Sequence, residues 1–218
     1  MLKKAEEEFE RSKWNQRYLD GTHGTLIPDP LLTEAFERYI EPLYPTPGCA
    51  LDVAGGTGRH AILLAEKGWK VTLVDIAEAG LANARRNAEP LAHQIEFHCA
   101  DLTQFRTEGR FYDLILVFYF VRRTIFKKLL SALNPGGLLI YKGYIRAQSQ
   151  LCGGPSNPDF YFEENELLNS FPELRVLHYR ELISNCGTAE FIGQKDMTPH
   201  KCASSEGWHE QWVRVPPG

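Results

Sequence analysis

The chain has 218 residues, of which 43% are hydrophobic and 24% charged, and its formal net charge is −4. This balance indicates one folded domain with short extensions and excludes a mostly disordered chain. The slight acidity argues against a strongly basic nucleic-acid surface. The longest apolar run, residues 114–121, is far shorter than the roughly 20 residues of a membrane helix. We therefore expect neither a nucleic-acid partner nor a membrane.

The cysteines favour a reducing compartment. There are five, an odd number at scattered positions, and no C-x-x-C occurs. The N-terminus has no apolar signal-peptide core. The spacing of His200, Cys202 and His209 fits no zinc pattern. We expect a cytoplasmic protein without a metal site.

In chain order, two helices are predicted before the main body. Residues 1–20 are charged, with aromatic residues about one turn apart, and predict an amphipathic helix. A loop follows at residues 21–30. Residues 31–41 predict a short helix that ends at Glu41-Pro42. Prolines and a glycine at residues 45–48 then break the chain.

From Cys49 onward, strands alternate with helices. Apolar segments predict strands at 49–54, 69–75, 95–100, 113–119 and 138–143, and helices are predicted at 59–67, 77–88 and 123–133. This alternation indicates a doubly wound α/β sheet of parallel strands with right-handed crossovers. Further on, residues 160–170 predict a helix, and 174–182 and 189–194 two strands of an antiparallel edge hairpin. The sheet then has seven strands and is mostly parallel.

Polar residues and glycines follow the first three strands. Gly55-Gly56-Thr57-Gly58 forms a turn directly after the first strand and before a helix N-terminus, where free N–H groups are available. Asp75 ends the second strand, where a carboxylate can accept hydrogen bonds from ribose hydroxyls. Asp101 follows the third. Because ligands bind at the carboxyl ends of such strands, these residues predict a nucleoside pocket.

The glycines alone do not decide between ligands. Gly56-x-Gly58-x-x-Ala61 formally matches a dinucleotide fingerprint, and glycines can also simply shape a turn. Asp52 at the end of the first strand would repel a diphosphate, whereas it would suit a ligand with an ammonium or sulfonium charge.

These segments resemble the class I S-adenosylmethionine-dependent methyltransferases. The resemblance is carried by LDVAGGTGRHA at 51–61, VTLVDIA at 71–77, CADLTQF at 99–105, YDLILVFYF at 112–120 and LNPGGLLIY at 133–141. The first loop glycine of the family is Ala54 here. The resemblance implies a Rossmann-like methyltransferase fold, with a helical lid at 1–47, a cofactor-binding domain at 48–195 and an extension of unknown role at 196–218.

A narrower resemblance covers most of the remaining chain. The segments WNQRY at 14–18, FVRR at 120–123 and residues 157–181 are similar to the tellurite-resistance and related small-molecule methyltransferases. The tail after residue 195 departs from that group. This resemblance implies a small-molecule acceptor, for which tellurite, selenite or a thiol are the candidates.

The resemblance also implies which residues hold S-adenosylmethionine and its product S-adenosylhomocysteine. The residues implied to bind the methionine end are Asp52, Ala54, Gly55, Gly56 and Gly58. Asp75 would bind the ribose, and Ile76, Asp101 and Leu102 would contact the adenine. The sulfonium would be flanked by Phe118 and Tyr119, and the lid residues over the cofactor would be Trp14 and Tyr18.

Methyl transfer from a sulfonium is an in-line displacement, so the protein mainly positions the acceptor and excludes water. Residues 118–121 read Phe-Tyr-Phe-Val in place of the Asn/Asp-Pro-Pro-Tyr signature of nitrogen methylation, which argues against amide or adenine acceptors. The catalytic candidates are Tyr119, Arg123 and His178. Each has a structural alternative: cofactor contact for Tyr119, ion pairing for Arg123, and edge protection for His178 on a late strand.

Three hypotheses follow from these patterns. The first is a methyltransferase with a small-molecule acceptor. The second is an NAD-dependent oxidoreductase, because the glycine pattern formally fits. The third is a non-catalytic domain that binds the cofactor and a partner. The intact cofactor motifs argue against this third hypothesis. The oligomeric state is left open by the sequence.

Overall fold

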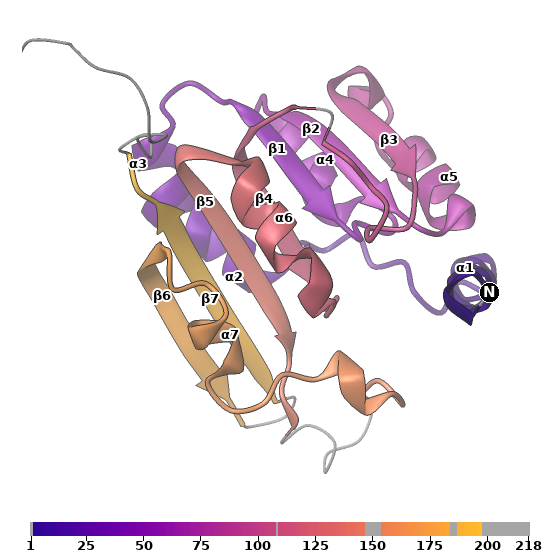
Figure 1. The fold of residues 1–218 in the computed structure, drawn as a ribbon. Coiled ribbons are helices and arrows are strands. Elements are labelled where there is room, and N and C mark those ends of the chain that lie inside the picture. Colours follow the sequence, from indigo (N-terminus) through magenta and orange to yellow (C-terminus); the bar gives the residue numbers. More distant parts are fainter. Residues whose placement is uncertain (1, 108, 147–153, 184–186, 198–218) are drawn as a thin grey trace, which may run out of the picture.

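The computed structural model describes residues 2–107, 109–146, 154–183 and 187–197, which form one seven-stranded sheet with helices on both faces (Figure 1). The strands are β1 (Cys49–Val53), β2 (Lys70–Asp75), β3 (Ile95–Cys99), β4 (Tyr112–Phe118), β5 (Leu133–Tyr144), β6 (Leu174–Leu182) and β7 (Thr188–Lys195). The helices are α1 (Leu2–Leu19), α2 (Pro30–Ala35), α3 (Glu41–Leu43), α4 (Arg59–Glu66), α5 (Glu78–Asn87), α6 (Phe126–Ala132) and α7 (Glu166–Asn169).

The strand order is β3-β2-β1-β4-β5-β7-β6. The pairs from β3 to β5 are parallel, whereas β7 is antiparallel to both β5 and β6. The α/β doubly wound sheet with its antiparallel edge hairpin is therefore confirmed. Strand order reverses between β1 and β4, so the carboxyl ends of these two strands mark the point where such sheets bind ligands.

Two hydrophobic clusters cover the faces of the sheet. The first packs α2, α4 and α5 against residues such as Leu73 and Leu116, and the second packs α6 and α7 against residues such as Val74 and Val117. Successive residues of a strand point to opposite faces, which is why neighbours along β2 and β4 enter different clusters. Covered faces explain the nearly continuous apolar sequence of these strands.

The helix predicted for residues 31–41 is longer than expected. Asp29 caps α2, a π-helical turn (Phe36–Ile40) follows, and α3 carries the chain across Pro42 to Leu43. The predicted end at Glu41-Pro42 is wrong because Pro42 lies in the first turn of α3, where a missing N–H costs little.

Two boundaries in the second half also differ from the prediction. Strand β5 begins at Leu133, and a register shift against β4 between Tyr112 and Leu114 takes up residues 134–137. The helix predicted at 160–170 is replaced by a 3₁₀ turn (Pro158–Phe160) and α7. Between them Tyr161 and Phe162 are buried, and Phe162 bridges to Ile145, so core packing overrides the helical pattern.

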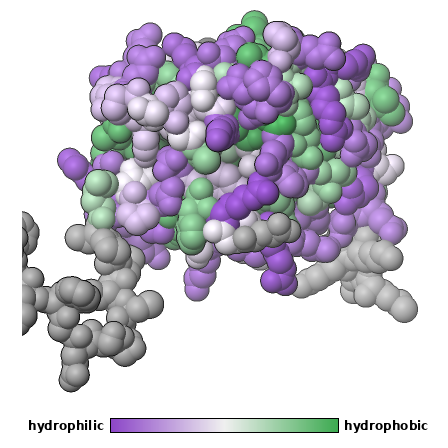
Figure 2. All heavy atoms as spheres, turned by 90° about the horizontal axis from the view of Figure 1, so that it is seen from above, coloured by the Kyte–Doolittle hydropathy of each residue, from purple (hydrophilic) through white to green (hydrophobic). Residues whose placement is uncertain are grey.

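Among the described residues, no helix has the length and apolar character that crossing a membrane requires. Figure 2 shows one face of the molecule with hydrophilic side chains over most of its area and smaller hydrophobic areas among them. The predicted extension lies almost wholly outside the described residues.

Candidate functional site

The turn after β1 has a backbone that favours small residues. Gly56 and Gly58 have positive φ angles of 55° and 82°, and Ala54 has a φ of 56°. A Cβ on Gly55 would lie 2.7 Å from Oδ2 of Asp52. The turn therefore has no room for a larger side chain at Gly55, and its backbone comes close to the carboxylate of Asp52.

Asp52 is buried next to the glycine turn, and one of its carboxylate oxygens has no hydrogen-bond partner. Its carboxylate is 1% exposed, and Oδ2 has no hydrogen-bond partner. Burial raises the pKa of Asp52 to about 7, although the positive charge of Arg59 lowers it in part. A buried, unpartnered oxygen is costly, and a cationic hydrogen-bond donor from a ligand would satisfy it.

Asp75 connects the glycine turn to the next helix. Its Oδ2 accepts the N–H of Gly56 at 2.9 Å, and its Oδ1 accepts the N–H of Ala77 at 2.8 Å. Burial nevertheless raises its pKa. Each carboxylate oxygen can accept more than one hydrogen bond, so ribose hydroxyls can still bind here.

Helix α1 lies beside α5 (Figure 1), and Arg11 on α1 contacts Ile76, directly after β2, and Cys99 at the end of β3. Oδ1 of Asn15 accepts the N–H of Ala79 at 2.8 Å and so satisfies an N–H at the start of α5. Arg11 donates to the carbonyl of Ile76 at 3.0 Å, and Gln104 donates to Glu7 at 2.8 Å. These bonds hold the predicted lid over the predicted adenine side of the site.

Tyr18 brings the lid into contact with the glycine turn. A Cβ on Gly56 would lie 2.4 Å from the hydroxyl oxygen of Tyr18, and one on Gly80 would lie 2.8 Å from its ring. Burial raises the pKa of Tyr18, and the charges of Asp75 and Asp52 add to the effect. The phenol therefore faces both carboxylates of the predicted pocket. Trp14 packs one turn away, with ring centroids 6.1 Å apart.

Gly80→Ala should release α1 from α5. The added methyl group overlaps the Tyr18 ring, while alanine itself favours the α5 helix by about 1 kcal/mol over glycine. We expect faster trypsin cleavage within residues 1–20 and a changed Trp14 fluorescence, with little change in global unfolding. Adding Tyr18→Ala should remove the effect of the substitution on Trp14 fluorescence. Gly24→Ala, which meets nothing within 4 Å, is the control; an equal response there would contradict the contact.

A second group of polar residues, the buried ion-pair network, lies beyond β4. Lys142 on β5 contacts Asp29 at 2.9 Å and Glu190 on β7 at 3.0 Å, and Arg180 on β6 contacts Glu190 at 2.7 Å. Lys142, Glu190 and Arg180 are directly opposite one another in the sheet register, so they share one face. The hydroxyl of Tyr119 donates to Asp29 at 2.9 Å.

Tyr119 is held in an unusual backbone conformation by this network. Its φ is 57°, and its N–H bonds the carbonyl of Lys142 at 2.7 Å. Such a conformation is strained for a tyrosine and persists only where its surroundings fix it. Burial, together with the charge of Asp29, raises the pKa of Tyr119, which keeps the phenol protonated. His60 accepts the N–H of Asp29, as expected of a packing residue, and burial lowers its pKa to about 3.

The other two catalytic candidates, Arg123 and His178, lie away from the glycine turn, on the segment after β4 and on β6. Arg123 donates to Glu166 at 2.5 Å and to the carbonyls of Asp159 and Tyr161, so it ties down the segment after β5. His178 lies on β6, with Nε2 buried, without a hydrogen bond and 3.6 Å from Glu190. The structure brings Tyr119 to the ligand end of β4 but does not bring Arg123 to it.

Three further cofactor candidates, Phe118, Asp101 and Leu102, have contacts within the protein. Phe118 is buried in the core with its ring 4.1 Å from that of His60. Oδ1 of Asp101 accepts the N–H of Thr103 at 2.6 Å, which leaves Oδ2 for a ligand. Leu102 packs against the second hydrophobic cluster.

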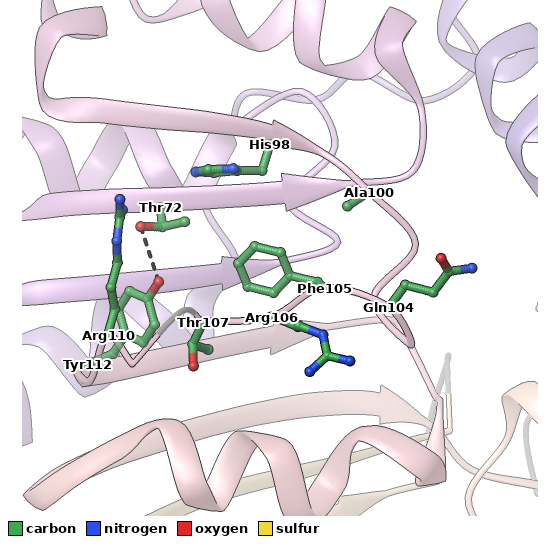
Figure 3. A pocket seen from close by; sticks show the side chains of 9 residues that line it. All are labelled: Thr72, His98, Ala100, Gln104, Phe105, Arg106, Thr107, Arg110 and Tyr112. Carbon is green, nitrogen blue, oxygen red and sulfur yellow. Dashed lines mark hydrogen bonds between the residues drawn. The ribbon is translucent and has the colours of Figure 1, made fainter.

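A cavity of about 290 Å³ lies apart from the glycine turn (Figure 3). It forms beside the connection from β3 to β4, whose described residues, 100–107 and 109–111, contain no helix, and its wall includes His98, Phe105 and Tyr112. The hydroxyl of Tyr112 is 3.4 Å from that of Thr72. None of the predicted site residues lines it, so it is a separate feature of the sheet face.

Sequence reasoning missed four residues that shape the site: Asn15, Arg11, Asp29 and Lys142. Asp29-Pro30 carried a recognisable helix-start signal, since aspartate is a preferred N-cap and proline a preferred first residue. The partners of the other three lie more than 60 residues away in the chain.

Residues 50–137 match the family model described as a methyltransferase domain. The release factor glutamine methyltransferase of Enterococcus faecalis is 40% identical over 76 residues, which are 34% of this chain and 27% of the relative. The tRNA 5-carboxymethoxyuridine methyltransferase of Escherichia coli K12 is 29% identical over 131 residues, which are 56% of this chain and 50% of that relative. The chain thus spans about a quarter to a half of these relatives.

Solved structures share the fold. The structure of TehB from Haemophilus influenzae has a TM-score of 0.63 at 20% identity, and the match covers 84% of this chain and 67% of that one. NodS from Bradyrhizobium japonicum, an N-methyltransferase crystallised with S-adenosylhomocysteine, has a TM-score of 0.61 at 16% identity, with coverages of 84% and 98%. The predicted fold class and family resemblance are confirmed.

Proposed function

We propose that this chain, whose residues 50–137 match the family model of a methyltransferase domain, transfers a methyl group from S-adenosylmethionine to a small-molecule acceptor by in-line displacement. The observation that best supports this cofactor is the buried carboxylate of Asp52 beside the glycine turn, whose Oδ2 has no hydrogen-bond partner. S-adenosylmethionine brings an ammonium group and a sulfonium group, and both are cations that favour such a carboxylate.

The residues present fit this cofactor. Asp52 would receive the ammonium group, the turn at residues 54–58 would line the methionine chain, and Asp75 the ribose. Ile76, Asp101 and Leu102 would surround the adenine. The bound cofactor supplies a methyl group activated by the sulfonium. Trp14 and Tyr18 on α1 would exclude water from the reacting atoms.

Tyr119 would orient the acceptor rather than remove its proton. Its hydroxyl already donates to Asp29, and its raised pKa keeps the proton in place at neutral pH. His60 is committed to the N–H of Asp29. An acceptor that is already an anion, such as a thiolate or a selenite- or tellurite-type oxyanion, needs no base. This supports an anionic acceptor, and the resemblance of residues 14–18, 120–123 and 157–181 to small-molecule methyltransferases supports a small molecule rather than a tRNA or a protein.

Two measurements test the proposal. Calorimetric titration should show binding of S-adenosylhomocysteine and not of NAD; the reverse result would favour the oxidoreductase reading of the glycine pattern. Cofactor consumption should then be measured with thiols, selenite, tellurite and phenolic acids, alongside tRNA and a release factor. Turnover only with tRNA or protein would refute the small-molecule acceptor and leave the methyltransferase assignment intact.

A further inference from the structure

Arg59 differs from other cations around the candidate site. Arg11, Arg123 and Lys142 each have a carboxylate partner within 3.0 Å. For Arg59, no carboxylate of the described residues is within ion-pair distance. Its hydrogen bond to the carbonyl of Ile27 is long, at 3.4 Å. A partly buried guanidinium with so few partners has donors left for a ligand.

The position of Arg59 is defined by its neighbours. It is the first residue of α4, directly after Gly58 of the glycine turn. Its guanidinium lies over the ring of Tyr119, 5.9 Å from the centroid. Its charge acts on Asp52 from the turn and on Tyr18 from α1, lowering the pKa of each against the effect of burial. Arg59 therefore lies where the turn, the lid and the end of β4 meet.

Asp52 and Arg59 flank the glycine turn, one before it on β1 and one after it at the start of α4, and carry opposite charges. Oδ2 of Asp52 is fully buried without a partner, so it calls for a cationic donor. The guanidinium of Arg59 would bind an anion, and a carboxylate matches the geometry of its planar N–H donors. A single chemical group that carries both charges close together is the zwitterion of an α-amino acid.

We propose that Arg59 binds the carboxylate of the methionine end of the cofactor, while Asp52 binds its ammonium group. The proposal rests on the proposed function and adds a residue that the sequence motifs did not assign. The two residues then recognise the amino-acid zwitterion, whereas Asp75 recognises the nucleoside. Free N–H groups at the start of α4 add to the attraction for the carboxylate.

The test compares two ligands that differ in the zwitterion. S-adenosylhomocysteine carries it, and 5′-methylthioadenosine has the same nucleoside and thioether without it. Calorimetric titrations use the wild type, Arg59→Met, which keeps the apolar stem, and Arg59→Lys, which keeps the charge. Arg85→Met, on an exposed ion pair of α5, is the control. We expect Arg59→Met to lower the affinity for S-adenosylhomocysteine at least tenfold and the affinity for 5′-methylthioadenosine less than twofold. Arg59→Lys should recover part of the lost affinity.

The outcomes separate this inference from the function on which it rests. A wild type that binds neither ligand refutes the cofactor assignment itself. Equal losses for both ligands in Arg59→Met, or no loss for either, overturn the role of Arg59. Because Arg59 also lowers the pKa of Asp52, the titrations are repeated at pH 8.5, where Asp52 is ionised. A loss that vanishes at pH 8.5 shows that Arg59 acts only through Asp52 and also overturns the direct contact.

Discussion

Lys142→Met is expected to lower the free energy of unfolding by about 3–5 kcal/mol, because it removes the cation shared by two buried carboxylates. Asp29 is 5% exposed and Glu190 is 2% exposed. Arg180 still reaches Glu190, but Asp29 would keep only uncharged donors, from Tyr119 and Leu31. For a chain of this size the melting temperature should fall by roughly 10 °C.

Thermal and urea unfolding check this expectation. Lys67→Met is the matched control, since Lys67 and Glu41 form an exposed pair at 3.3 Å that should contribute less than about 1 kcal/mol. A loss at position 142 no larger than in the control would contradict the network. Adding Asp29→Asn to Lys142→Met should recover part of the stability, since one unpaired charge is removed.

The network also predicts acid sensitivity. Burial opposes the ionisation of Asp29, yet its bonds to Lys142 more than compensate and lower its pKa; Glu190 follows the same pattern with Arg180 and Lys142. Carboxylates with lowered pKa values stabilise the folded protein above their unfolded pKa of about 4, and this contribution is lost as the pH falls through the folded values. In Lys142→Met this part of the acid dependence should shrink.

Asp52→Asn should weaken cofactor binding and stabilise the ligand-free protein. Loss of a charge-assisted contact to the ammonium group should reduce the affinity for S-adenosylhomocysteine about ten- to a hundredfold. A folded pKa of about 7, compared with an unfolded value near 4, means that the folded state holds the proton more strongly. Ionised Asp52 therefore destabilises the fold increasingly as the pH rises from 4 to 7, and fully above 7.

Removing that charge should raise the free energy of unfolding by about 1–3 kcal/mol at pH 8, and the gain should shrink as the pH falls towards 4. In the wild type, the affinity for S-adenosylhomocysteine should rise about tenfold from pH 6 to pH 8, because only ionised Asp52 attracts the ammonium group. Denaturant unfolding and calorimetry across this range check both effects. Asp20→Asn, at an exposed residue directly after α1, is the control. An unchanged pH dependence in Asp52→Asn would refute the assignment.

Local patterns predicted most of the sheet. Alternation of apolar strands with helices from Cys49 onward, and the late pair of strands, matched the observed order of elements within a few residues. Asp52 and Asp75 lie at the ends of β1 and β2, as predicted. Their positions could be predicted because they depend only on the strand to which each belongs. The helix predicted at 160–170 failed because burial of Tyr161 and Phe162 depends on residues far away in the chain.

The 218 slightly acidic residues include the glycine turn with Asp52 and Asp75 on one side of β4, and the buried ion-pair network of Asp29, Lys142 and Glu190 on the other. The sequence alone determined the fold class, the glycine turn and the carboxylates after the strands, because short-range periodicity and turn chemistry govern these features. Only the tertiary structure decided that Asp29 meets Lys142, that Asn15 bonds the start of α5, and that Arg59 has no carboxylate partner among the described residues. Ion pairing joins residues far apart in sequence, and no local pattern encodes which charges the folded chain brings together.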